Sequence, residues 1–317
     1  MTTNQITSGK VQFIEINEDN NDQRVDNFLM SKLKGVPKSR IYKILRSGEV
    51  RVNKGRVKPS HRLQTSDIVR IPPVRLNEKQ STSIPDRLIE ELNQNILFEN
   101  DDLIIINKPS GLAVHAGSGI AFGVIDILRA QRFKDAFVEL AHRLDRETSG
   151  CLVLAKSRTA LTQLNTLFTS ANAISKQYIT LTKGNWPDGE NRIDAPLSKN
   201  EIKSGERMVT INPNGKHAIS LFRSTEQFSD CSLTEVTLLT GRTHQIRVHA
   251  NSEGHPVAGD EKYGDKIFNK QLKAIGLKRM FLHARHLEFN LNGPINITAP
   301  LDNNLRNVIE KLRSNEQ

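Results

Sequence analysis

The chain has 317 residues, of which 37% are hydrophobic and 5% aromatic, and its formal net charge is +10 at pH 7. That length is enough for two domains, and the longest apolar runs, of four or five residues such as LIII at 103–106, exclude a transmembrane helix. The N-terminus has no apolar signal segment, and Cys151 and Cys231 form no metal-ligand spacing, so we expect a cytoplasmic protein with reduced thiols and no zinc site.

The excess positive charge is concentrated in residues 32–62. This segment holds 11 Lys or Arg and one acid, Glu49, whereas the rest of the chain balances 34 basic against 34 acidic residues. A compact basic module on a neutral body indicates a nucleic-acid handle, because charge that only confers solubility would be dispersed. The side chains that we expect to bind RNA here are Lys38, Arg40, Lys43, Arg46, Arg51, Lys54 and Arg56.

The first part of the chain predicts a small α+β domain. Residues 1–21 read as a flexible N-terminus with one short strand, VQFIEI. Residues 22–72 follow as a domain of two amphipathic helices, RVDNFLMSKL and a helix from Pro37 to Gly48, with short strands in EVRVNKGRVKPS and SDIVRIP. Residues 73–95 are rich in Pro, Ser and charge, which favours a linker that ends in a short helix, DRLIEELNQ.

Residues 96–317 predict a larger second domain in which strands dominate. We expect helices at 124–131 and 159–170 and in the tail LRNVIEKLR. The mixture predicts an α+β fold built on a large mixed, mostly antiparallel sheet. The expected strands lie at 96–99, at 103–107 and in VELA, CLVLA, KQYITLT, SLFRST, SLTEVTLL, HQIRVHA and LEFNL.

Two dense charged clusters stand out in the second domain, AHRLDRETSG at 141–150 and TGRTHQIRVHA at 240–250. In an extended HQIRVHA, Arg247 would lie on the polar face and could reach Asp145. An Asp beside an Arg has a low pKa, stays ionised and can act as a nucleophile without an activating base. An ion-pair network that closes the end of a sheet explains the same spacing equally well, so the residues alone leave both interpretations open.

The first cluster also resembles a known signature. HRLDRETSG at 142–150 is similar to the H-R-L-D-x-x-T-S-G motif of the RluA-type pseudouridine synthases, and the basic module resembles an S4 RNA-binding domain. Within the family, GVPKSRIYKILRSGEVRVN and SGERMV are most similar to a branch that acts on large-subunit (23S) ribosomal RNA. Further segments resemble family motifs in the expected order: NKPSGLAVH (107–115), KQYIT (176–180), TGRTHQIRVH (240–249), GHPVAGDEKYG (254–264) and LHARHLEF (282–289).

The resemblance implies that specific uridines of ribosomal RNA are flipped out and isomerised without a cofactor or metal. It makes Asp145 the catalytic nucleophile, Tyr178 the aromatic that stacks on the uracil and helps remove the C5 proton, and Arg247 the partner of Asp145. It leaves open whether Asp145 attacks C1′ or C6 or promotes glycal formation. Supporting contacts to RNA are expected from Arg143, His142, Arg242, Lys108 and His115.

Three alternatives remain at this point. One is a non-catalytic RNA-binding or ribosome-assembly protein on the same folds, which would be expected to lack Asp145, Tyr178 or Arg247. Another is a second branch of the family with other uridine targets. The third is a hydrolase with paired carboxylates, which is disfavoured because Asp145 and Glu147 lie on one loop and no recognisable motif positions a second acid. We expect a monomer that binds ribosomal RNA and no membrane.

Overall fold

The computed structural model describes residues 10–33, 36–74, 84–117, 120–134, 136–170, 173–201 and 207–315. Lys34 of the basic segment, residues 75–83 of the predicted linker and residues 204–206 of SGERMV lie outside these ranges. The chain divides into two compact units, Met1–Ser83 and Ile84–Gln317. No helix in the described ranges has both the length and the apolar character needed to cross a bilayer.

The first unit comprises β1 (Gln12–Glu15), η1 (Glu18–Asn20), α1 (Val25–Lys32), α2 (Lys38–Arg46), β2 (Arg51–Val52), β3 (Gly55–Arg56) and β4 (Ile68–Ile71). Its four strands form one antiparallel sheet in the order β1-β4-β2-β3. The apolar stripes of the two helices, which include Phe28, Leu29, Ile44 and Leu45, pack with the inner face of the sheet in a single core. The elements expected from the sequence are all present.

The second unit is built on one large mixed sheet. Its order is β10-β13-β14-β9-β15-β8-β6-β5, with β16 paired to β15 and β7 paired to β8, and among the described strands only the β8–β15 pair is parallel. A separate hairpin pairs β11 with β12. This confirms the predicted α+β fold class. The strands are β5 (Ile96–Glu99), β6 (Leu103–Lys108), β7 (Glu139–Leu140), β8 (Ser149–Ala155), β9 (Ile174–Lys183), β10 (Glu190–Asp194), β11 (Leu197–Glu201), β12 (Arg207–Ile211), β13 (Ile219–Gln227), β14 (Cys231–Leu238), β15 (Leu282–Asn290) and β16 (Pro294–Thr298).

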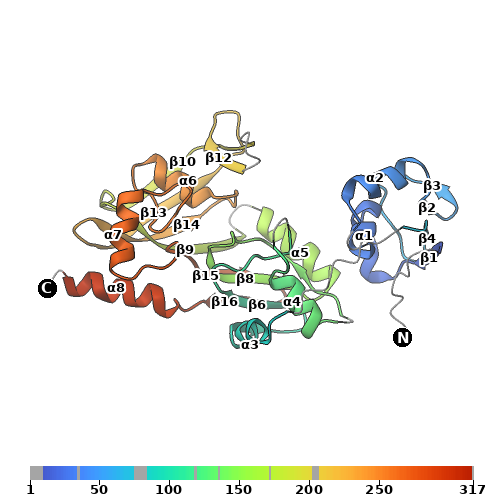
Figure 1. Cartoon of the computed structure of the whole chain (residues 1–317), viewed down its shortest axis with the longest axis horizontal. Coiled ribbons are helices and arrows are strands. Elements are labelled where there is room, and N and C mark those ends of the chain that lie inside the picture. Colours follow the sequence, from blue (N-terminus) through green and yellow to red (C-terminus); the bar gives the residue numbers. More distant parts are fainter. Residues whose placement is uncertain are drawn as a thin grey trace. The chain divides into compact units, whose positions relative to one another are not determined.

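Helices cover both faces of this sheet (Figure 1). They are α3 (Asp86–Gln94), α4 (Val124–Gln131), α5 (Arg158–Thr169), α6 (Gln245–Ser252), α7 (Lys266–Ala274) and α8 (Asn303–Asn315). Along β6, Ile104 and Ile106 face α3 and α4, whereas Leu103 and Ile105 face α5. Because both faces are covered, β6 and β8 are continuous apolar runs rather than alternating ones. Helix α3, which the sequence placed in the linker, packs on the second unit through Leu92.

One predicted element is wrong. HQIRVHA was expected to be a strand, but its residues from Gln245 form helix α6. Every position from Gln245 to Ala250 is buried, so the segment lacks the polar face from which a helical period could be read. His244, with φ 55°, provides the left-handed turn that precedes the helix. The side chain of Gln245 then closes this turn, because its Oε1 accepts hydrogen bonds from Arg242 N and Thr240 Oγ1.

Candidate active site

Asp145 lies on the loop that joins β7 to β8. These strands pair antiparallel, with Leu140 opposite Leu154, so the charged residues of the loop emerge at one end of the sheet. Thr148 N donates a hydrogen bond to Asp145 O across 3.1 Å, and Leu144 is buried beneath the loop. Gly150 then enters β8 with φ 106°, where an added Cβ would lie 2.2 Å from the carbonyl oxygen of Ala284. The Asp145 loop is therefore held in place by β8, which packs closely against β15.

Lys108 was expected to contact RNA, and the structure contradicts this. The residue is fully buried, and its Nζ donates to the carbonyl oxygens of Pro109, Leu112 and Arg146 across 2.8, 2.8 and 3.0 Å. Burial lowers the pKa of Lys108 to about 7, although the charges of Glu147 and Asp145 act against this. Three backbone acceptors already use the ammonium group, so Lys108 supports the Asp145 loop from within the fold.

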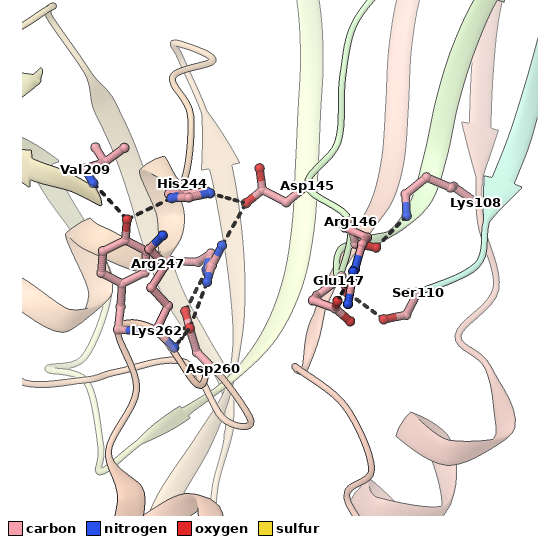
Figure 2. A network of polar contacts seen from close by, with 11 residues as sticks. Lys108, Ser110, Asp145, Arg146, Glu147, Val209, His244, Arg247, Asp260 and Lys262 are labelled. Atoms are coloured by element: carbon pink, nitrogen blue, oxygen red, sulfur yellow. Dashed lines mark hydrogen bonds and ion pairs between the residues drawn. The ribbon is translucent and has the colours of Figure 1, made fainter. Parts of the chain in front are cut away.

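Arg247 pairs with Asp145 as the sequence predicted, although it lies on helix α6 and not on the expected strand. Its Nη1 donates to Asp145 Oδ2 across 3.1 Å, while its Nε and Nη2 donate to the two oxygens of Asp260 across 2.6 and 2.8 Å (Figure 2). Asp260 also accepts the backbone N–H groups of Lys262 and Tyr263. The planar guanidinium is therefore fixed on one side by a buried carboxylate, and it presents its remaining edge to Asp145.

Arg247 and Asp260 stabilise each other's charged forms. Burial acts to lower the pKa of Arg247, but the hydrogen bonds and charge of Asp260, with a smaller contribution from Asp145, raise it overall. Burial acts to raise the pKa of Asp260, but Arg247 and the N–H groups of Tyr263 and Lys262 bring it below its usual value. Arg247 therefore remains a cation beside Asp145.

A pocket of about 740 Å³ opens beside Asp145 and Tyr178. Tyr178, on β9, is half-buried and packs partly against apolar side chains. Burial, reinforced by the charge of Asp145, raises the pKa of Tyr178, so the phenol is protonated at neutral pH. The pocket walls carry several cationic or ionisable side chains, namely Arg143, Lys176, Arg242 and His115.

The supporting residues expected from the sequence have different surroundings. Arg143, His115 and Arg242 are exposed at the pocket, and Arg242 Nε donates to His217 O across 2.9 Å. His142 instead stacks on Phe168, and its Nε2 accepts a hydrogen bond from Val153 N across 3.0 Å. Burial is the main cause that lowers its pKa to about 3. A neutral ring bonded to the backbone of β8 favours a role in shaping the loop over contact with phosphate.

In the first unit, the basic residues expected to bind RNA are all exposed. Four of them project from α2 and three from the β2–β3 hairpin or its turn. Lys54 lies in that turn with φ 68°. They are Lys38, Arg40, Lys43, Arg46, Arg51, Lys54 and Arg56.

Three residues near Asp145 were missing from the expected site: Asp260, His244 and Tyr263. His244 Nε2 lies 3.7 Å from Asp145 Oδ2, and its Nδ1 lies 2.8 Å from the Tyr263 hydroxyl. The signal for two of them was present in GHPVAGDEKYG, which contains both Asp260 and Tyr263. His244 was visible only as one charged residue among several in its motif.

Comparisons with known proteins agree with this geometry. Residues 102–252 match the RNA pseudouridylate synthase family, and residues 23–69 match the S4 domain. The chain is 49% identical over 319 residues to the ribosomal large subunit pseudouridine synthase C of Haemophilus ducreyi, covering 99% of each chain. It is 46% identical over 311 residues to the protein of that name in Escherichia coli (strain K12), covering 96% of this chain and 97% of the other.

Among solved structures, human RNA pseudouridylate synthase domain containing 4 is similar with a TM-score of 0.60 and 26% identity, over 72% of this chain and 96% of that chain. Human RNA pseudouridylate synthase domain containing 1 shares the fold with a TM-score of 0.56 at 23% identity, over 71% of this chain and 96% of that chain.

Proposed function

Because this chain belongs to the RNA pseudouridylate synthase family, we propose that it isomerises specific uridines of large-subunit (23S) ribosomal RNA to pseudouridine, with Asp145 as the nucleophile. The observation that carries the proposal is the meeting of Asp145, Tyr178 and Arg247, from three segments far apart in the sequence, around a small cavity of about 60 Å³. Asp145 and Tyr178 also line the pocket of about 740 Å³. The names of the relatives favour the synthase C branch over the synthase D branch, which was the alternative within the family.

The pocket suits a flipped base. A uridine in a helix cannot present its glycosidic bond to a carboxylate until it leaves the stack, and unstacked bases are commonly held against aromatic rings. Tyr178 offers such a ring beside Asp145. Because the phenol keeps its proton, it stacks without adding a second negative charge near the carboxylate. We therefore favour stacking as its main role over the removal of the C5 proton.

The reaction itself needs no further reactant. The N1–C1′ bond breaks, the uracil turns, C5 bonds to C1′, the C5 hydrogen is released and N1 gains a proton, so atoms balance within an isomerisation. Arg247 holds Asp145 beside the pocket and partly neutralises it. Arg143, exposed at the mouth, is suited to fill the space left in the RNA by the flipped base.

The S4-like unit would bind RNA through its phosphates, independently of base identity. Its seven exposed cations lie on a helix and a hairpin of one small unit. Phosphate contacts of this kind release counterions, so binding weakens steeply as salt rises. The pocket of the second unit would then select the target uridine.

We also propose that the enzyme acts as a monomer in the cytoplasm, which sedimentation and cell fractionation test.

The test is the Asp145→Asn variant, which keeps the size of the side chain but removes the charge. We expect no pseudouridine, measured by release of tritium from uridine C5, together with RNA binding close to that of the native enzyme. Full activity of the variant would exclude Asp145 as the nucleophile. Mapping pseudouridines in 23S ribosomal RNA from cells that lack this gene identifies the target positions.

The non-catalytic alternative has lost support. A protein that had decayed to RNA binding would have no reason to keep a buried carboxylate, Asp260, that orients Arg247 toward Asp145. Burying such an ion pair gives little net stability, so its presence is better explained by what it positions.

A further inference from the structure

His244 adjoins Asp145 in an unusual backbone conformation. Its φ of 55° is in the left-handed region, which side chains other than glycine enter at an energetic cost. Its two ring nitrogens face different partners: Nδ1 lies 2.8 Å from the Tyr263 hydroxyl, and Nε2 lies 3.7 Å from Asp145 Oδ2 (Figure 2). The strained turn therefore places an imidazole between a phenol and the proposed nucleophile.

The partners of the Tyr263 hydroxyl determine where its proton lies. Val209 N is 2.9 Å from this oxygen, and a backbone N–H can only donate, so the hydroxyl oxygen is its acceptor. If His244 Nδ1 also donated to that oxygen, the hydroxyl proton of a buried Tyr263 would have no acceptor among its described neighbours, which is unfavourable for a buried donor. The hydroxyl therefore donates to Nδ1. Burial raises the pKa of Tyr263, which keeps that proton in place.

His244 is neutral in these surroundings. Burial is the main cause that lowers its pKa; Arg247 and Lys262 lower it further, and Asp145 and Asp260 act in the opposite direction. A neutral imidazole carries one proton. With Nδ1 accepting from Tyr263, that proton is on Nε2, the nitrogen that faces Asp145.

We propose that Tyr263 fixes His244 as the Nε2–H tautomer, so that His244 and Arg247 both address Oδ2 of Asp145 and leave Oδ1 as the oxygen that reacts. Both contacts converge on the same oxygen, since Arg247 Nη1 also lies 3.1 Å from Oδ2, and within the described part of the chain neither group contacts Oδ1. The proposal rests on the proposed role of Asp145 as nucleophile. The distance of 3.7 Å exceeds a formed hydrogen bond, and such contacts tighten when substrate binds.

The contacts from Val209 through Tyr263 and His244 also link the wall of the pocket to Asp145. Val209 belongs to β12, and both Val209 and Lys199 of the paired strand β11 line the pocket. A substrate that shifts this hairpin would move the N–H that anchors the Tyr263 hydroxyl. Tyr263 and His244 thereby connect occupation of the pocket to the orientation of Asp145, and we class both as positioning residues.

Nitrogen-15 NMR of the imidazole rings in the full chain tests the tautomer directly. His244 is assigned as the signal that is missing from the His244→Gln variant. We expect the pattern of a neutral Nε2–H ring in the native protein, and a mixture of tautomers in Tyr263→Phe, which loses the donor to Nδ1. An Nδ1–H ring in the native protein overturns the proposal. This measurement needs no activity, so it is independent of whether Asp145 proves to be the nucleophile.

Two substitutions of His244 separate the proposed role from a merely structural one. A Gln amide can place its N–H near the position of Nε2, whereas an Asn amide reaches only the position of Nδ1. The left-handed backbone favours the opposite order, because Asn tolerates it better than other residues. We expect His244→Gln to keep kcat at least about 10-fold above that of His244→Asn, the effect of one hydrogen bond to a charged group. Equal or higher kcat for His244→Asn overturns the proposal.

The Tyr263→Phe variant should lower kcat by about 10- to 100-fold with little change in KM, because it removes orientation rather than substrate contact. Tyr42→Phe is the matched control: it deletes a phenol hydroxyl that donates to Asp26 in the other unit, and its kcat should equal the native value. A native kcat for Tyr263→Phe would contradict the link to Asp145. Activity retained by Asp145→Asn, with an Nε2–H ring still observed, would instead refute the proposed function and leave the tautomer standing.

Discussion

Lys108 illustrates at the scale of one residue how a motif position can serve the site without contacting substrate. Lys108→Met keeps the apolar stem but removes the donors to three carbonyl oxygens, one of which belongs to Arg146, next to Asp145. We expect a loss of about 1–3 kcal/mol in the free energy of unfolding, measured in urea, and a lower single-turnover rate. The exposed Lys270→Met is the control and should stay within about 0.5 kcal/mol of native. An unchanged single-turnover rate for Lys108→Met would show that the Asp145 loop keeps its conformation without the hydrogen bonds of Lys108.

His283 makes a prediction about acid stability. It is buried between Ser149 and Ala299, and burial is the main cause that lowers its pKa to about 4. Between about pH 6.5 and 4 the unfolded chain binds a proton here that the folded chain does not, so stability falls as pH decreases. From pH 7.5 to 5.0 the native protein should lose about 2 kcal/mol more than His283→Gln, measured by urea unfolding. Parallel losses in the two proteins would contradict this assignment.

At the scale of elements, Gln245 explains why α6 begins where it does. Its amide accepts from Thr240 and Arg242 and donates to Ile219 and Ser220, so all its capacity is used inside the fold. Gln245→Leu should cost about 3 kcal/mol or more in the free energy of unfolding, because several buried polar groups lose their partner. It should also lower kcat, since Arg247 lies on the same turn of helix. Gln245→Glu keeps an acceptor for Thr240 and Arg242 but replaces the donor to Ile219 O, so it should be most destabilised above pH 7, where the buried carboxylate is ionised and cannot donate.

The sequence predicted elements well where apolar residues recur with a period or form short continuous runs, as in β6 and β8. The helices at 124–131 and 159–170 and most strands of the large sheet follow from such patterns, and so does the loop that carries Asp145 between two apolar runs. Strands β10 and β16 and helix α7 were not predicted. The pattern failed at HQIRVHA, where uniform burial erases the period. The pairing of Arg247 with Asp145 was predicted correctly from an incorrect strand, because the motif resemblance did not depend on secondary structure. Asp260 and Tyr263 lie in GHPVAGDEKYG, which resembles a family segment, but the sequence alone assigned them no role because only tertiary structure brings them to Arg247 and His244.

At the scale of the whole molecule, the two units have separate hydrophobic cores and different net charges. The core of the first unit contains only residues from Ile14 to Val74, and the cores of the second unit begin with Ile84. Most of the net positive charge of the chain lies in the first unit, whereas the Asp145 pocket lies in the second. RNA binding by the first unit and catalysis by the second should therefore be separable by truncation, and the structure indicates at which residue to truncate the chain.

The boundary before α3 gives the sharpest test. A fragment of residues 84–317 keeps Leu92 in its core and should fold, retain most of its kcat at saturating RNA and show a raised KM at physiological salt. The slope of its log affinity against log salt should be smaller in magnitude by about 0.7–0.9 for each phosphate contact removed.

A fragment of residues 96–317 lacks α3 and exposes the apolar residues that Leu92 covers, so it should be less stable by about 2–5 kcal/mol. Native affinity and salt dependence in residues 84–317 would contradict the role of the first unit. Equal stability of the two fragments would instead contradict the assignment of α3 to the second unit, because a buried leucine contributes to the core in which it is packed.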